Sequence, residues 1–187
     1  MRRTVSVRAF VFFILFLAVL GTRGGSSAHA QLSGDREYLI KAAFLYNFLK
    51  FVEWPVEALP EISDTITTCV VGEDPFGNAL ESIRGKTVKN RSLAIRRVEE
   101  LRNLGTCQLV FISASEKNRL RKITDALKGR SVLTVGDFEG FLESGGIIRL
   151  FMQSNNIRFE INLDTAEQAQ LKVSSRLLNL AKVVRGH

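Results

Sequence analysis

The stretch CQLVFISASEKNRLRKITDALKGRSVLTV, residues 107–135, decides the fold because it contains a complete strand, helix and strand. β-Branched and aromatic residues dominate positions 107–112 and 132–135, which predicts two buried strands. Between them, Ser115 is placed to cap a helix over residues 116–127, whose apolar side chains recur at helical spacing. This order favours parallel neighbours in one sheet.

The sequence before residue 107 shows the same alternation of helices and strands. Residues 37–52 form an apolar helical segment that ends before Pro55, and residues 66–71 form a strand-like run. A helix through Leu80 and a polar strand at 93–97 follow. We therefore expect an α/β domain in which a mainly parallel sheet is flanked by helices on both faces.

The last third of the chain does not continue this alternation of helices and strands. Residues 147–152 and 156–162 read as the two strands of a C-terminal β-hairpin, joined by residues 153–155. A short helix is expected from Asp164 or Thr165 through Ala169, and a final amphipathic helix from Ser174 or Ser175 through Val184.

Residues 1–30 have the features of a secretory signal peptide. Arg2, Arg3 and Arg8 precede an apolar run over residues 9–20, and residues 28–30, Ala-His-Ala, match the pattern that signal peptidase cleaves. The run is shorter than the about 20 apolar residues that a membrane span needs. We expect cleavage near Ala30 and a single domain over residues 31–187.

The positive net charge is largely a property of this leader. The chain carries +7, but four of its 26 basic residues lie in residues 1–30, which leaves 22 bases against 19 acids. Nucleic-acid binding needs basic residues clustered on one face. This small excess does not predict a nucleic-acid partner.

Few residues are suited to catalysis or to metal binding. His187 is the one histidine of residues 31–187, and a chain terminus seldom holds an imidazole in place for a nucleophilic triad. No histidine accompanies the two cysteines in a zinc pattern. Residues 85–87, Gly-Lys-Thr, lack the preceding glycine of a phosphate-binding loop. We expect no enzymatic activity, no metal and no cofactor.

Cys69 and Cys107 each lie in a strand-like apolar run. Two cysteines in an exported chain favour a disulfide between them. In the chain-entropy model this bond would stabilise the fold by roughly 4 kcal/mol. Two buried free thiols are the alternative.

Several stretches together resemble one protein family. They are residues 38–48, 53–55, 71–77, 107–113, 132–137, 145–150 and 158–163. Their combination is similar to the YfiR family of periplasmic proteins, and the resemblance covers essentially all of residues 31–187. The family's strand cysteines match Cys69 and Cys107, whereas a second pair found in some members, near residues 140–150, has no counterpart here.

The resemblance implies a periplasmic, non-enzymatic regulator. YfiR-like proteins bind the periplasmic sensory domain of an inner-membrane diguanylate cyclase and repress it. Release of the cyclase raises cyclic-di-GMP and favours biofilm formation. In the family's best-known arrangement, an OmpA-like outer-membrane lipoprotein sequesters the repressor.

The second hairpin strand offers a candidate partner surface. Its apolar residues alternate with Arg158, Glu160 and Asn162, so one face belongs to the core and the other faces water or a partner. We expect these three residues, with Leu163 and Ala166 beyond them, to bind the partner. Glu160→Lys should then weaken binding and keep the fold. A solvated strand face with an Arg158–Glu160 pair is the alternative.

Two further interpretations concern the first helix and its end. The helix carries more apolar surface than one side of a domain needs, so Leu45, Phe48 and Val52 are candidate contacts in a homodimer. Trp54 is a candidate for a contact or a ligand pocket, with core packing as the alternative.

A periplasmic small-molecule sensor that acts on another signalling partner or a transporter is the competing function. Its ligand would lie at the strand ends, near residues 72–73 and 113–115.

Overall fold

The structure is a computed structural model that describes residues 27–59 and 62–185, so most of the predicted signal peptide lies outside the described residues. The chain divides into two compact units, residues 1–35 and 36–187. The described part of the first unit is helical, and the described strands belong to the second. Among the described helices, none is long and apolar enough to cross a bilayer.

The elements follow one another along the chain as helices (α), 3₁₀ helices (η) and strands (β). They are α2 (Ser27–Phe51), β1 (Val52–Glu53), η1 (Val56–Ala58), β2 (Thr65–Val71), η2 (Ala79–Ser82), β3 (Thr87–Val88), β4 (Arg91–Val98), η3 (Leu101–Thr106), β5 (Leu109–Ile112), η4 (Ala114–Arg119), α3 (Leu120–Ala126), β6 (Leu133–Gly136), β7 (Ile148–Gln153), β8 (Asn156–Asn162), α4 (Leu163–Gln168), β9 (Lys172–Val173), α5 (Ser175–Leu178) and β10 (Lys182–Val184).

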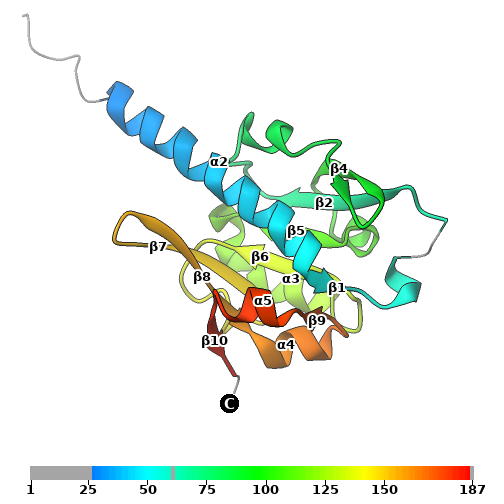
Figure 1. The fold of residues 1–187 in the computed structure, drawn as a ribbon. Coiled ribbons are helices and arrows are strands. Elements are labelled where there is room, and N and C mark those ends of the chain that lie inside the picture. The colour runs from blue at the N-terminus through cyan, green and yellow to red at the C-terminus, as the bar shows by residue number, and fades with distance from the viewer. Residues whose placement is uncertain (1–26, 60–61, 186–187) are drawn as a thin grey trace, which may run out of the picture. The chain divides into compact units, whose positions relative to one another are not determined.

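Eight of these strands form one sheet in the order β10-β8-β7-β6-β5-β2-β4-β3 (Figure 1). The pairs from β4 through β7 are parallel, as is β8 with β10, whereas β3–β4 and β7–β8 are antiparallel. The prediction of an α/β fold with a mainly parallel sheet is confirmed. Ser154 and Asn155 make the turn between β7 and β8 with φ angles of 48° and 61°, the left-handed conformation that two-residue turns require.

Alternate residues of the strands enter two buried clusters. On β2, Ile66 and Val70 belong to the first core, which also contains Leu45 and Phe48 of α2. Cys69 and Val71 belong to the second core, which also contains Leu120 and Ile123 of α3. Because both kinds of position are buried, the central strands β2, β5 and β6 contain no charged residue.

Helix α2 buries one face in the domain, whereas its apolar residues Leu39 and Ile40 are exposed. In Figure 1 its carboxyl-terminal half crosses the sheet. Leu45, Phe48 and Val52 are each 0% exposed, and the Phe48 ring lies 5.1 Å from that of Phe159. The interpretation of these three residues as dimer contacts is therefore wrong, because their surface is already used inside the chain.

A disulfide joins Cys69 on β2 to Cys107, which directly follows η3. The Cα atoms lie 6.0 Å apart, and both residues belong to the second core. The predicted pairing is confirmed.

The carboxyl-terminal helix is shorter than the sequence pattern predicts. Helix α5 ends at Leu178, and residues 182–184 instead form strand β10, which pairs in parallel with β8. Leu180, counted in the predicted apolar face, is 70% exposed. The open edge of β8 takes up the backbone hydrogen-bonding groups of β10, and this tertiary pairing outweighs the local helical pattern. Two other predicted helices are partly 3₁₀, at η2 and η4.

Candidate functional site

Glu160 lies at the centre of an ion-pair cluster near one edge of the sheet. Its Oε1 accepts a hydrogen bond from Nε of Arg149 at 2.6 Å, and its Oε2 lies 3.6 Å from Nζ of Lys182. The Glu160 side chain is 8% exposed and that of Lys182 is 72% exposed. A buried carboxylate thus has a positive partner on each neighbouring strand.

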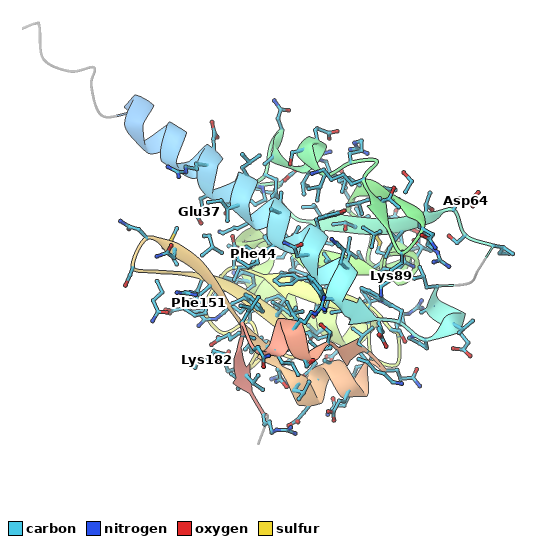
Figure 2. The ribbon with its side chains drawn as sticks, in the orientation of Figure 1. Glu37, Phe44, Asp64, Lys89, Phe151 and Lys182 are labelled. Atoms are coloured by element: carbon cyan, nitrogen blue, oxygen red, sulfur yellow. A yellow bond between two sulfur atoms is a disulfide. The ribbon has the colours of Figure 1, made fainter. Side chains whose placement is uncertain are left out.

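Strand register brings the three charges together. Glu160 on β8 pairs with Arg149 on β7 and with Lys182 on β10, and Figure 2 labels Lys182 on that edge strand. Paired residues on adjacent strands project from the same face of a sheet. The alternate residues of β8, Ile157, Phe159 and Ile161, enter the first core, which fixes the register of the strand.

Two polar contacts continue this cluster toward α4. The Asn162 side chain accepts a hydrogen bond from the Thr165 N–H at 3.0 Å and caps the helix. Oδ1 of Asp164 lies 3.7 Å from Nη1 of Arg185, which directly follows β10. Charges on Lys182 and Arg185 therefore hold the edge strand at two places.

These residues surround a cavity of about 720 Å³. Three bases and three acids line it, together with uncharged residues. The charged residues are Glu143, Arg149, Glu160, Asp164, Lys182 and Arg185. Fixed charges of both signs are one of the features that give protein interfaces their specificity.

The structure places the predicted partner residues at different depths. Arg158 is exposed and Leu163 is half-buried, whereas Glu160 and Asn162 are only 6% and 9% exposed. Ala166 is 0% exposed. The expectation that Glu160, Asn162 and Ala166 lie open on a surface is wrong, because Arg149, β10 and the first core cover them. Glu160→Lys would put a third positive charge between Arg149 and Lys182, so it would disturb the fold.

A family model for YfiR/HmsC-like proteins matches residues 38–182. The chain belongs to the YfiR/HmsC-like family. The match covers every described strand except part of β10, so the Glu160 cluster lies almost wholly within it.

A solved structure shares the fold of this family member at low sequence identity, and a second shows a weaker likeness. A conserved domain protein from Vibrio cholerae O1 biovar El Tor matches with a TM-score of 0.50 and 10% identity, over 78% of this chain and 60% of that chain. The ABC domain from Streptococcus pneumonia in complex with L-Trp matches with a TM-score of 0.44 and 9% identity, over 69% of this chain and 57% of that chain. This chain thus spans about 60% of the length of the Vibrio protein. A comparison with curated proteins gives no match.

A second buried cluster joins two of the stretches that resemble the YfiR family. Nζ of Lys41 lies 2.6 Å from Oδ2 of Asp137 and 2.6 Å from Oε1 of Glu37. The Tyr38 hydroxyl donates to the same Asp137 oxygen at 3.0 Å. Asp137 directly follows β6, so these contacts fasten α2 to the carboxyl end of a central strand.

This cluster shifts two pKa values in the same direction. Burial and the Asp137 carboxylate raise the pKa of Tyr38. For Lys41, burial lowers the pKa, but hydrogen bonds to Asp137 and Glu37 outweigh that effect and raise it. Both groups are therefore protonated at neutral pH and serve to hold the helix in place.

The strand ends proposed for a ligand are packed against each other. Oγ of Ser115 accepts a hydrogen bond from the Glu73 N–H at 3.0 Å. A Cβ atom on Gly72 would lie 2.5 Å from that oxygen. These residues do not line the cavities beside Arg121, Glu160 or Trp54.

Trp54 borders a different cavity, of about 570 Å³. Its neighbours there include Pro55, Val56 and Leu171, and its buried Nε1 has no hydrogen-bond partner among the described atoms. Within residues 27–59 and 62–185, no cluster of three or more His, Cys, Asp or Glu side chains is arranged for a metal ion.

The sequence pattern does not identify four charged residues of this site, namely Arg149, Asp164, Lys182 and Arg185. Arg149 lies in a stretch that resembles the family. Its position opposite Glu160 follows when the two hairpin strands are paired around a turn at residues 154–155. Lys182 and Arg185 gave no such signal, because their segment reads as a helix. Their role depends on the pairing of β10 with β8.

Proposed function

We propose that this protein is a periplasmic regulator that binds the periplasmic sensory domain of an inner-membrane diguanylate cyclase and represses it, thereby controlling cyclic-di-GMP and biofilm formation. Membership of the YfiR/HmsC-like family over residues 38–182 carries this proposal. The predicted signal peptide supports the periplasmic location.

Repression of this kind requires binding and no chemistry. A regulator that prefers the inactive conformation of its partner by ~3 kcal/mol shifts the equilibrium about a hundredfold. Rigid binding groups serve this purpose because less conformational freedom is lost when the complex forms.

We place the partner surface on the exposed rim of the Glu160 cluster. Arg158, Lys182 and Arg185 are exposed there, and the buried Glu160 and Asn162 hold the strands that carry them. Phe151 pairs with Arg158 across the β7–β8 ladder. The ring of Phe151 lies 5.3 Å from the Arg149 guanidinium. The rim thus combines positive charge with an ordered aromatic side chain, a combination common in protein interfaces.

Charge reversal on the rim tests this surface. Arg158→Glu combined with Lys182→Glu should weaken binding to the purified periplasmic domain of the cyclase at least tenfold in calorimetry. Lys86→Glu with Lys89→Glu makes the same change in net charge at exposed positions that flank β3 and should leave the affinity unchanged. Equal affinities for the rim variant and the parent protein would discard this surface.

Two further parts of the proposal follow from the family arrangement. An OmpA-like outer-membrane lipoprotein would sequester the regulator, and the rim variants should lose both partners if these compete for one surface. A homodimer remains a prediction without assigned contacts, and sedimentation at micromolar concentration tests it.

A small-molecule sensor is the second candidate function. The cavity beside Trp54 favours it, since apolar side chains and a buried indole N–H without a partner border one hollow. Native mass spectrometry of protein purified from the periplasm should detect a bound molecule, and Trp54→Leu should lose it. Protein recovered without any bound molecule would count against this function.

A further inference from the structure

The net positive charge of the folded unit lies on one short segment. Residues 36–185 contain 22 bases and 18 acids, of which six bases and two acids lie in residues 114–131. The remaining residues, 36–113 and 132–185, contain sixteen of each. We call residues 114–131 the basic segment. It comprises η4, α3 and the loop into β6, and its bases are Lys117, Arg119, Arg121, Lys122, Lys128 and Arg130.

The six basic side chains all face solvent. Each is exposed, while Leu120, Ile123 and Leu127 of the same segment turn into the second core. Arg119 pairs with Glu116 at 3.2 Å and Lys128 with Asp125 at 2.6 Å. Among the described residues, no ion pair involves the other four bases, although Arg121 interacts electrostatically with Asp125.

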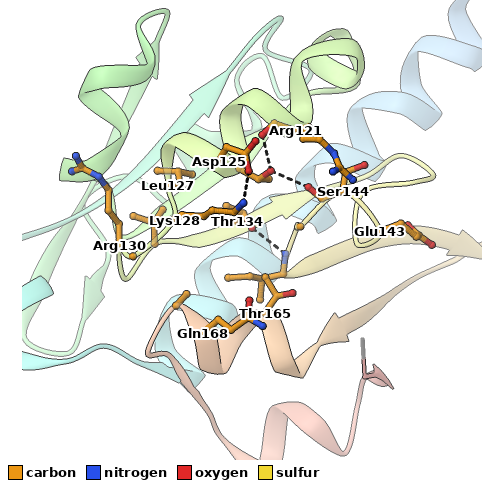
Figure 3. A pocket seen from close by; sticks show the side chains of 16 residues that line it. Arg121, Asp125, Leu127, Lys128, Arg130, Thr134, Glu143, Ser144, Thr165 and Gln168 are labelled. Atoms are coloured by element: carbon orange, nitrogen blue, oxygen red, sulfur yellow. Dashed lines mark hydrogen bonds and ion pairs between the residues drawn. The ribbon is translucent and has the colours of Figure 1, made fainter. Parts of the chain in front are cut away.

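Three of the bases border one hollow on this side of the molecule. Arg121, Lys128 and Arg130 line a cavity of about 300 Å³, seen in Figure 3 with side chains from α3, the loop before β7, and α4. Asp125 and Glu143 also line it, and Lys128 pairs with Asp125. Ser144, Thr165 and Gln168 add neutral hydrogen-bonding groups.

The composition of the basic segment narrows the class of partner. It contains no aromatic residue, and the cores of protein interfaces are rich in aromatic side chains and poor in lysine. Single-stranded nucleic acids are bound by stacking on aromatic rings, which this segment does not provide. Exposed bases, most of them without an ion pair, suit the diffuse negative charge of lipid phosphates.

We propose that the basic segment docks the protein onto the anionic phosphate surface of a lipid bilayer, with the hollow beside Arg121 and Lys128 receiving a lipid phosphate. Each base near such a surface increases partitioning about fivefold. Docking would orient the sheet against the membrane, whichever membrane protein it regulates. The inference does not rest on the proposed function.

Co-sedimentation with lipid vesicles tests this docking surface. The protein purified from the periplasm should bind vesicles that contain phosphatidylglycerol and leave vesicles of phosphatidylcholine alone unbound. Binding should weaken as salt rises, since the Debye length shrinks from about 8 Å at physiological ionic strength to about 3 Å at 1 M. Binding that is equal for both lipids would overturn the proposal.

Two triple variants remove the same number of positive charges from different parts of the protein, and so test whether the location of the charge matters. Lys117→Gln with Arg121→Gln and Lys122→Gln should reduce partitioning about a hundredfold, as expected for three bases. Lys86→Gln with Lys89→Gln and Arg176→Gln removes the same charge from exposed positions elsewhere and should change partitioning much less. An equal loss in both triples would overturn the assignment to this segment.

Two more outcomes would also contradict membrane docking. Glycerol 3-phosphate that displaces the protein from vesicles at low millimolar concentration would show a site for a soluble phosphate. A basic-segment triple that still binds vesicles but no longer binds the cyclase domain would show a protein-binding face instead.

Discussion

Nε of Arg149 lies 2.6 Å from Oε1 of Glu160 across the β7–β8 pair, and the two side chains are only 21% and 8% exposed. This relationship assigns Glu160 a structural role. The carboxylate holds two neighbouring strands in register, and the bases Arg158, Lys182 and Arg185 around it are exposed.

Removal of Arg149 should destabilise the fold strongly. Arg149→Met leaves Glu160 buried with Lys182 alone, 3.6 Å away and mostly exposed. Breaking a buried ion pair on one side lowers the free energy of unfolding by about 3 kcal/mol. Urea unfolding followed by circular dichroism measures this change. Arg149→Met with Glu160→Gln should recover part of the loss, while Lys182→Gln should lose less than about 1 kcal/mol. An Arg149→Met protein as stable as the parent would contradict this role.

Reduction of the disulfide should also lower stability. Cys69 and Cys107 are 38 positions apart in the chain, and a loop of this length corresponds to roughly 4 kcal/mol in the chain-entropy model. Urea midpoints measured with and without dithiothreitol check this value, and Cys69→Ala with Cys107→Ala should resemble the reduced protein. Coincident midpoints for the oxidised and reduced protein would exclude a stabilising bond.

The cluster of Tyr38, Lys41 and Asp137 predicts a loss of stability at alkaline pH. The pKa of Tyr38 is raised above 10.0 and that of Lys41 above 10.5, so the folded chain binds both protons more tightly than the unfolded chain. This contribution is complete below the unfolded pKa values and is lost as pH rises through the folded ones. The free energy of unfolding should therefore fall above about pH 10, and Tyr38→Phe should reduce the slope. Tyr46→Phe, at a hydroxyl that donates to the Thr87 carbonyl, is the control. If the free energy of unfolding falls with pH equally steeply in both variants, Tyr38 does not contribute to the alkaline loss of stability.

Gly72 should tolerate substitution less well than Gly85. Both have positive φ angles, 85° and 73°, so alanine at either place carries a similar backbone penalty of roughly 1–2 kcal/mol. A Cβ at Gly72 would also meet Ser115 Oγ at 2.5 Å, whereas nothing lies within 4 Å at Gly85. Gly72→Ala should therefore unfold at a lower urea concentration than Gly85→Ala. The reverse order would show that the strand ends are more open than the structure indicates.

Much of the fold follows from patterns that are local in the sequence. The buried strands around Cys69 and Val110 contain no charged residue because both of their faces are covered, and the helix between β5 and β6 shows its inward residues at regular spacing. The disulfide follows from one cysteine on β2 and a second just before the neighbouring strand β5. Features of this kind need no knowledge of distant contacts.

The candidate site depends on contacts that the sequence does not specify. The alternation of apolar and polar residues along β8 predicts correctly that Glu160 points away from the first core. That face is buried by β10, however, which lies more than 20 residues later and whose sequence pattern predicts a helix. The apolar helix α2 likewise suggested a dimer, because the sequence does not show how many neighbours surround it. In both cases tertiary packing decided which surfaces stay open.

Cellular cyclic-di-GMP in the source bacterium tests the central claim most directly. Deletion of this gene should raise the nucleotide level, and the exported protein supplied from a plasmid should restore it. The Arg158→Glu, Lys182→Glu variant should fold, reach the periplasm and fail to restore the level. A level unchanged by deletion, under conditions where the cyclase is present and active, would contradict repression by this protein.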